Sequence, residues 1–161
     1  MRFRWLAAIS VSIALVVGSP SIAMAGTLAN ETRDLRTDVS QTIGSYVTKY
    51  GDRVTPTQKA TLTSLARDAD KELLKVQRAV SRAENIPSSQ RSKKLIAINA
   101  ALRTHAAAES RAEASLASAR SILEPKLSLF EALNALSDYE RLMDSYDNLG
   151  TALKAQREAI R

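Results

Sequence analysis

The sequence predicts an all-α protein, a four-helix bundle whose helices run up, down, up and down. Its 161 residues include only five glycines and four prolines, while Ala, Leu and charged residues are abundant. Apolar residues recur at steps of three and four after residue 26, and few segments alternate with the period of two that marks strands. Gly51 and three prolines, Pro56, Pro87 and Pro125, fall at the breaks between these segments, whereas Gly44 and Gly150 lie inside expected helices. We therefore expect four amphipathic helices joined by short breaks.

The N-terminal segment has the three parts of a secretory signal peptide. Arg2 and Arg4 form a short positive region, residues 5–17 are largely apolar, and Ala23 and Ala25 are small residues at the positions that a signal peptidase reads. The apolar stretch is shorter than the ~20 residues that span a bilayer. We expect cleavage near Ala25 and a product that is periplasmic or extracellular, with no transmembrane segment left.

The segment after the predicted cleavage point, residues 26–161, is long enough for one domain with its own core. The chain has no cysteine, which excludes a lipoprotein anchor, disulfides and covalent haem attachment. The formal net charge is +6. Residues 26–94 carry 13 basic and 8 acidic side chains, whereas residues 95–161 carry 8 and 9. The positive charge is therefore concentrated in the first half of this domain, which is a weak sign of an anionic partner.

The first two helices have clear boundaries. The first is expected over residues 28–50, and Gly51 suits the left-handed residue that closes a helix. The second begins after Thr55, which together with Gln58 forms a capping box. Its apolar residues form a heptad-like seam: Leu62, Leu65, Ala69, Leu73, Val76, Val80 and Ala83.

The other two helices are longer. The third is expected over residues 89–123, and the fourth begins after Ser128, which forms a second capping box with Glu131. The apolar seam of the fourth helix is Leu129, Leu133, Leu136, Met143, Tyr146, Leu149, Leu153 and Ile160. Seams this narrow also fit a rival architecture, an extended helical hairpin that forms a coiled-coil homodimer with a second copy.

The one histidine of the chain, His105, falls on the apolar seam of the third helix together with Glu109. In an antiparallel hairpin His105 is expected to lie near Tyr146 and Asp147 of the fourth helix, and Glu109 near Met143 and Asp144. Buried polar groups need partners, so we interpret this polar layer as a hydrogen-bonded layer that fixes helix register. A metal site at His105, Glu109 and Asp147 is the weaker alternative. A noncovalent haem held by His105 and Met143 is weaker still, and we expect no cofactor.

Five cations form a basic stripe along the second helix. Within an arc of about 80°, opposite the apolar seam, lie Arg67, Lys71, Lys75, Arg78 and Arg82. The stripe is about 22 Å long at a rise of ~1.5 Å per residue. Like charges at this spacing destabilise a helix, so the pattern suggests contact with an anionic partner, although a solvated face is the simpler reading. No aromatic residues interleave with the cations, so sequence-specific nucleic-acid recognition is not expected.

These features predict a secreted, non-catalytic interaction module of the bacterial cell envelope. Its partner would be an envelope polyanion, bound by the basic stripe, or a protein, and a homodimer is compatible with the seams. One alternative is a carrier of a metal or small ligand that uses the polar layer around His105. Another is a small all-α enzyme, which would need a solvent-reaching pocket that holds Glu109, Arg103 or Arg111 beside facing carboxylates.

Overall fold

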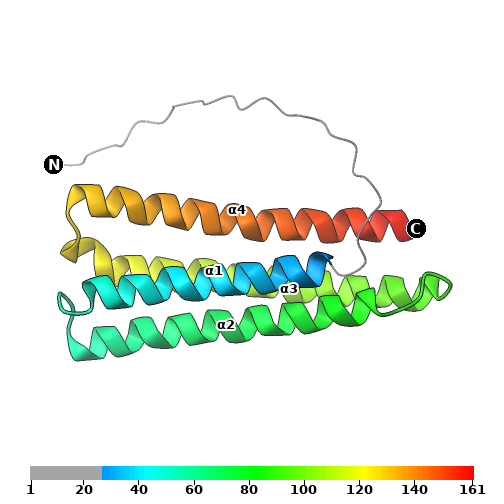
Figure 1. The fold of residues 1–161 in the computed structure, drawn as a ribbon, viewed down its shortest axis with the longest axis horizontal. Helices are drawn as coiled ribbons and strands as arrows, with labels where there is room; N and C mark the ends of the chain where they lie inside the picture. Colours follow the sequence, from blue (N-terminus) through cyan, green and yellow to red (C-terminus); the bar gives the residue numbers. More distant parts are fainter. Residues whose placement is uncertain (1–26) are drawn as a thin grey trace, which may run out of the picture.

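The structure is a computed structural model that describes residues 27–161, and these residues form a bundle of four long helices (Figure 1). The helices are α1 (Thr27–Tyr50), α2 (Pro56–Glu84), α3 (Arg91–Leu123) and α4 (Leu129–Ile160), and a short 3-10 helix, η1 (Glu124–Lys126), joins α3 to α4. No strand occurs within these residues. The all-α four-helix prediction is confirmed, whereas the predicted signal peptide lies outside the described residues.

Each helix packs against its neighbour in the sequence, and α4 also contacts α1. Consecutive helices run in opposite directions in Figure 1, as the short connections between them require. Within residues 27–161 no helix is both long enough and apolar enough to cross a membrane.

Both predicted capping boxes are present. The Thr55 side chain accepts a hydrogen bond from the backbone N–H of Gln58, and the Gln58 side chain accepts one from the backbone of Thr55. Ser128 and Glu131 form the same reciprocal pair at the start of α4. Each box satisfies two N–H groups that a helix start otherwise leaves unpaired. The third helix starts at Arg91 rather than at residue 89, because the preceding residues form a turn in which Gln90 N–H donates to the carbonyl of Pro87.

The hydrophobic core consists of two clusters. The larger cluster draws on all four helices: Leu28, Leu35, Val39, Ile43, Ala69, Leu73, Val76, Val80, Ala101, Ala108, Ala112, Leu142, Tyr146, Leu149 and Leu153. The smaller cluster lies where α1 ends and α2 begins, and its buried members are Tyr50, Leu62, Ala119 and Leu123. Because α4 supplies none of these four residues, the core at this end is built from three helices.

The N-terminal half of α4 therefore differs from the prediction. Leu129, Leu133 and Leu136 were expected in the core, but their exposed fractions are 76%, 56% and 39%. The buried residues of α4 begin only at Leu142. The helical period correctly identifies the face of α4 that is turned toward the bundle, but along this half the neighbouring helices do not reach it.

Candidate functional site

The predicted polar layer exists in the core between α3 and α4. His105 is only 3% exposed, and its Nε2 lies 2.9 Å from the carbonyl oxygen of Tyr146. A carbonyl oxygen can only accept, so Nε2 carries the proton and donates this hydrogen bond. The ring lies close to Gly150, where an added Cβ would stand 2.9 Å from the Cε1 atom of His105. The glycine thus lets the imidazole approach the backbone of α4.

Glu109 lies one turn further along α3, at the edge of this layer. Its Oε2 atom is 3.7 Å from the Nδ1 atom of His105, and its side chain is 30% exposed. Burial raises the pKa of Glu109, the charge of His105 opposes that shift, and the facing Asp147 adds to it. The hydroxyl of Tyr146 is buried, with no hydrogen-bond partner among the described residues. The layer therefore holds one paired imidazole, one weakly acidic carboxyl and one unpaired phenol.

The structure brings His105 and Glu109 together as the weak metal hypothesis required. Asp147 is exposed on α4 and adjoins Glu109 closely enough to affect its pKa. Among residues 27–161, however, no three His, Asp or Glu side chains are grouped in a way that could hold a metal ion. The imidazole nitrogen that faces α4 already bonds a backbone carbonyl, which suits a structural layer.

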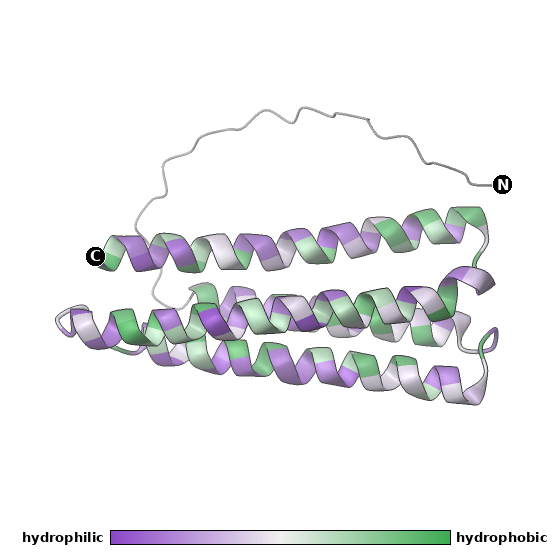
Figure 2. Cartoon of the chain, turned by 180° about the vertical axis from the view of Figure 1, so that it is seen from behind, coloured by the Kyte–Doolittle hydropathy of each residue, from purple (hydrophilic) through white to green (hydrophobic). Residues whose placement is uncertain are grey.

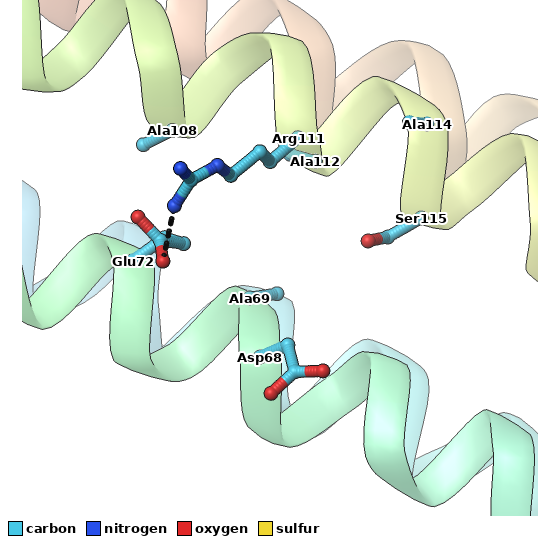
Figure 3. A pocket seen from close by; sticks show the side chains of 8 residues that line it. All are labelled: Asp68, Ala69, Glu72, Ala108, Arg111, Ala112, Ala114 and Ser115. Carbon is cyan, nitrogen blue, oxygen red and sulfur yellow. Dashed lines mark ion pairs between the residues drawn. The ribbon is translucent and has the colours of Figure 1, made fainter.

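An open pocket of about 370 Å³ lies between α2 and α3 (Figure 3). Arg111 spans it and pairs with Glu72 at 2.6 Å, and Asp68 lies on the same side as Glu72. The floor is made of small residues, Ala69 and Ala112 among them. This pocket holds Arg111 beside facing carboxylates, as the enzyme hypothesis required, but Glu109 and Arg103 do not line it.

The charges in this pocket are suited to an ion pair rather than to proton transfer. Hydrogen bonds from Lys75 and then Arg111 lower the pKa of Glu72. A general acid or base works best with a pKa near the working pH, and these cations move Glu72 away from it. The hydroxyl of Ser115 lines the same pocket, and the lining residues include no histidine that could activate it. The pocket therefore holds a bridge between two helices.

The basic stripe lies on the outer face of α2, where all five of its side chains are exposed. Two of them form ion pairs within the helix, Lys71 with Asp68 at 3.2 Å and Lys75 with Glu72 at 2.6 Å. These acidic neighbours reduce the field along the middle of the stripe. The stripe is accessible, but its net charge is smaller than the sequence pattern alone suggests.

A second, larger hollow, an apolar groove of about 590 Å³, lies beside the N-terminal half of α4. It lies at the end of the bundle where the core has only three helices. There the inward face of α4 is separated from α1 and α3, and the side chains of α4 do not fill the space between α4 and these two helices. Its aliphatic lining is Ile43, Val47, Leu62, Leu116, Leu123, Leu127, Leu129, Leu133, Leu136 and Leu142. Figure 2 shows hydrophobic colouring over the same end of α4.

Polar contacts at the edges of the groove hold α4 in place. The hydroxyl of Tyr46 donates a 2.6 Å hydrogen bond to Asp138, and Arg141 pairs with Asp38, so α1 and α4 are joined beside the groove. Burial and the bond to Asp138 raise the pKa of Tyr46. These bonds connect the two helices through polar atoms at the edge and leave the aliphatic walls open.

The start of α4 is fixed by a second set of polar contacts. Arg53, in the α1–α2 turn, pairs with Glu131 at 2.8 Å. The same carboxylate accepts the backbone N–H of Ser128. Two hydrogen bonds lower the pKa of Glu131 to about 2: the bond from Arg53 has the larger effect and the bond from Ser128 the next. The first turn of α4 is thus tied to the α1–α2 turn at the same end of the bundle (Figure 1), and the groove is held open as part of the fold.

The sequence predicted the polar layer and the basic stripe but missed the groove. The signal for it was indirect: alanines and serines crowd the second half of α3, at positions such as Ala117 and Ala119, opposite large leucines of α4. Small side chains facing large ones can let helices approach closely or can leave a space, and the sequence does not say which.

Comparisons with protein-family models, with curated proteins and with solved structures gave no match for this chain.

Proposed function

We propose that the protein is a non-catalytic interaction module of the bacterial cell envelope, and that it binds an apolar partner in the groove beside α4. The observation that carries the proposal is an open aliphatic groove whose α4 wall carries three large exposed apolar side chains, Leu129, Leu133 and Leu136, with the exposed Phe130 next to Leu129 in the sequence.

The groove has the character of a binding site rather than of a packing defect. Binding sites for apolar ligands are typically 300–1,000 Å³ in volume, with apolar walls and few polar groups. Leu129 and Phe130 are about three-quarters exposed at the first turn of α4, and clustered apolar surface of this kind marks interaction sites on soluble proteins.

The proposed cellular location rests on the sequence of residues 1–25, which has the pattern of a signal peptide.

A titration with the uncharged apolar dye N-phenyl-1-naphthylamine tests the proposal. Residues 26–161 are used, because all four helices and both core clusters lie within that range. We expect a saturable rise in fluorescence, since the dye brightens in an apolar site. Leu133→Asn should weaken binding by roughly tenfold, because a buried leucine contributes ~1.5–3 kcal/mol.

The matched control is Ile96→Asn. Ile96 is 68% exposed on α3 and does not line the groove, so this variant should bind the dye as the natural chain does. Absence of saturable binding by the monomeric chain, or equal loss in both variants, would contradict the assignment of the groove as the binding surface.

The basic stripe supports a second candidate, binding of an anionic envelope polymer or lipid surface along α2. Arg67, Arg78 and Arg82 are exposed on the outer face of the helix, and charges on such a face attract polyanions at low ionic strength. The test is retention on vesicles that contain anionic lipid across a salt series. A variant with Lys71, Lys75, Arg78 and Arg82 changed to Gln should lose retention at low salt, and equal elution of both proteins would contradict this role.

A further inference from the structure

We propose that the partner of the groove is a second copy of this chain, so that two chains join their groove faces across a two-fold axis. The inference rests on the proposed function, because it names the partner of the same site. It follows from the shape, size and charge of this face.

The groove and a row of side chains able to fill it lie on the same face. Leu129, Leu133 and Leu136 follow one another at helical spacing along one wall of the groove, and Phe130, which follows Leu129 in the sequence, is 73% exposed. A two-fold interface requires that one patch be complementary to itself. A ridge next to a groove meets this requirement, since rotation by 180° places the ridge of each copy over the groove of the other.

The size of the groove favours side chains over a whole inserted helix. A helix with its side chains is ~10–12 Å across and rises 5.4 Å per turn. A volume of about 590 Å³ therefore holds less than two turns of an inserted helix. A row of leucine and phenylalanine side chains from a helix lying over the opening fits instead, and α4 of a second copy carries such a row.

The exposed area is also of the right order. Phe130 and its three leucine neighbours are between 39% and 76% exposed, which corresponds to apolar surface on the order of 500 Å². A stable interface buries about 800 Å² on each partner. The open groove walls and their polar edge supply the remainder, so the face is large enough for a pair of chains.

Charge pairing around the groove favours a copy over a charged partner. Arg53 pairs with Glu131 at 2.8 Å, and Arg120 pairs with Glu124 at 3.5 Å. Asp138 is 3.6 Å from Arg141 and accepts the Tyr46 hydrogen bond. A face with a net charge would repel its own copy, whereas a face whose charges are compensated within the chain can meet itself without that cost.

The mass of residues 26–161, measured by analytical ultracentrifugation across a concentration series, tests the inference. We expect a reversible dimer, and the variant with Leu129→Asn and Leu133→Asn should dimerise at least about tenfold more weakly. Both positions are exposed in the single chain, and circular dichroism checks that the helices remain. Ile96→Asn, a similarly exposed apolar residue outside the groove, should dimerise as the natural chain does.

A second measurement locates the interface directly. The chain has no cysteine, so Ser137→Cys places a single thiol on the exposed side of α4 near the groove, and Ser92→Cys places one at the start of α3. Oxidation should cross-link the Ser137→Cys protein much faster than the Ser92→Cys protein.

Three results would overturn the inference: a monomer at every concentration, a dimer that the double variant retains, or equal cross-linking at both positions. If the chain is a monomer that still binds the apolar dye in the groove, the proposed function stands with a different apolar partner. If it is a monomer that binds no dye, both proposals fail.

Discussion

The imidazole of His105 lies against the backbone of Gly150, at a distance that leaves no room for a side chain. A Cβ atom at position 150 would stand 2.9 Å from the Cε1 atom of His105. The ring is fixed by its 2.9 Å hydrogen bond to the carbonyl of Tyr146, one helical turn before the glycine. A glycine inside a helix destabilises it by ~1 kcal/mol relative to Ala. Here the absence of a side chain at position 150 lets the imidazole of His105 approach α4 and form its buried hydrogen bond.

Gly150→Ala should therefore destabilise the protein by about 1–3 kcal/mol, because the added methyl overlaps a ring that cannot move away. Gly44 is the matched control, since among the described residues nothing lies within 4 Å of the Cβ that alanine would add. Gly44→Ala should stabilise the protein by ~0.5–1 kcal/mol through helix propensity alone. Urea unfolding of both variants measures these changes.

A double-mutant cycle separates the overlap with the ring from other effects of the methyl group. When His105 is replaced by Ala, the obstacle to a Cβ at position 150 disappears. The cost of Gly150→Ala should then fall to about zero or become a gain, which corresponds to a coupling of ~1–3 kcal/mol between the two positions. If the effects of the two substitutions on stability are additive, the contact between His105 and position 150 is not the cause of the destabilisation by Gly150→Ala.

Tyr146→Phe should leave stability unchanged or raise it by up to about 1 kcal/mol, although Tyr146 is only 1% exposed. Its hydroxyl is buried without a partner within residues 27–161, and a buried unpaired hydroxyl is unfavourable. Thermal unfolding of the variant measures the effect. A loss of 2 kcal/mol or so would show that the hydroxyl has a partner in solution, such as ordered water.

The stability of the protein should depend on pH through Glu109. Burial raises the pKa of this carboxyl in the folded chain above its ordinary value of 4.5, so the folded state binds the proton more tightly than the unfolded state. The resulting stabilisation is fully present below pH 4.5 and is lost as the pH rises through the folded pKa. Free energies of unfolding measured across this range should decline less steeply for Glu109→Gln than for the natural chain. If the free energies of unfolding of the two proteins change with pH in parallel, the pKa of Glu109 is not raised in the folded chain.

Glu131 should act in the opposite direction. Its pKa falls from 4.5 to about 2 because Arg53 and Ser128 bond its ionised form. Its stabilisation is therefore present above pH 4.5 and is lost as the pH falls toward 2. At neutral pH, Glu131→Gln should be less stable than the natural chain, and the difference should vanish in acid. Glu140→Gln, at an exposed position of the same helix, is the control at neutral pH and should leave stability nearly unchanged.

Much of the fold follows from local signals in the sequence. The capping boxes at Thr55 and Ser128 were predicted because they require only residues three apart, and both form. The burial of His105 beside Tyr146 was predicted because a short turn fixes which positions of α3 and α4 face each other. Such features depend on helical spacing and loop length, which the sequence carries directly.

The groove could not be predicted in the same way. The period of Leu129, Leu133 and Leu136 determines which face of α4 points inward, and the structure keeps that orientation. Whether α1 and α3 come close enough to bury this face depends on the packing of small side chains such as Ala119 and on polar contacts between helices. The bond from Tyr46 to Asp138 joins residues 92 positions apart in the chain, and a single sequence gives no indication of such a pair.

Methyl NMR of residues 26–161, recorded as the apolar dye is added at a concentration at which the chain is monomeric, tests the central claim most directly, because it observes individual side chains that line the groove. If the groove is the binding surface, the methyl signals of Leu129, Leu133 and Leu136 shift together and saturate, while the exposed methyls of Ile96 stay unchanged. If the groove signals stay fixed, or if Ile96 shifts with them, the groove is not a binding surface and the proposed function is wrong.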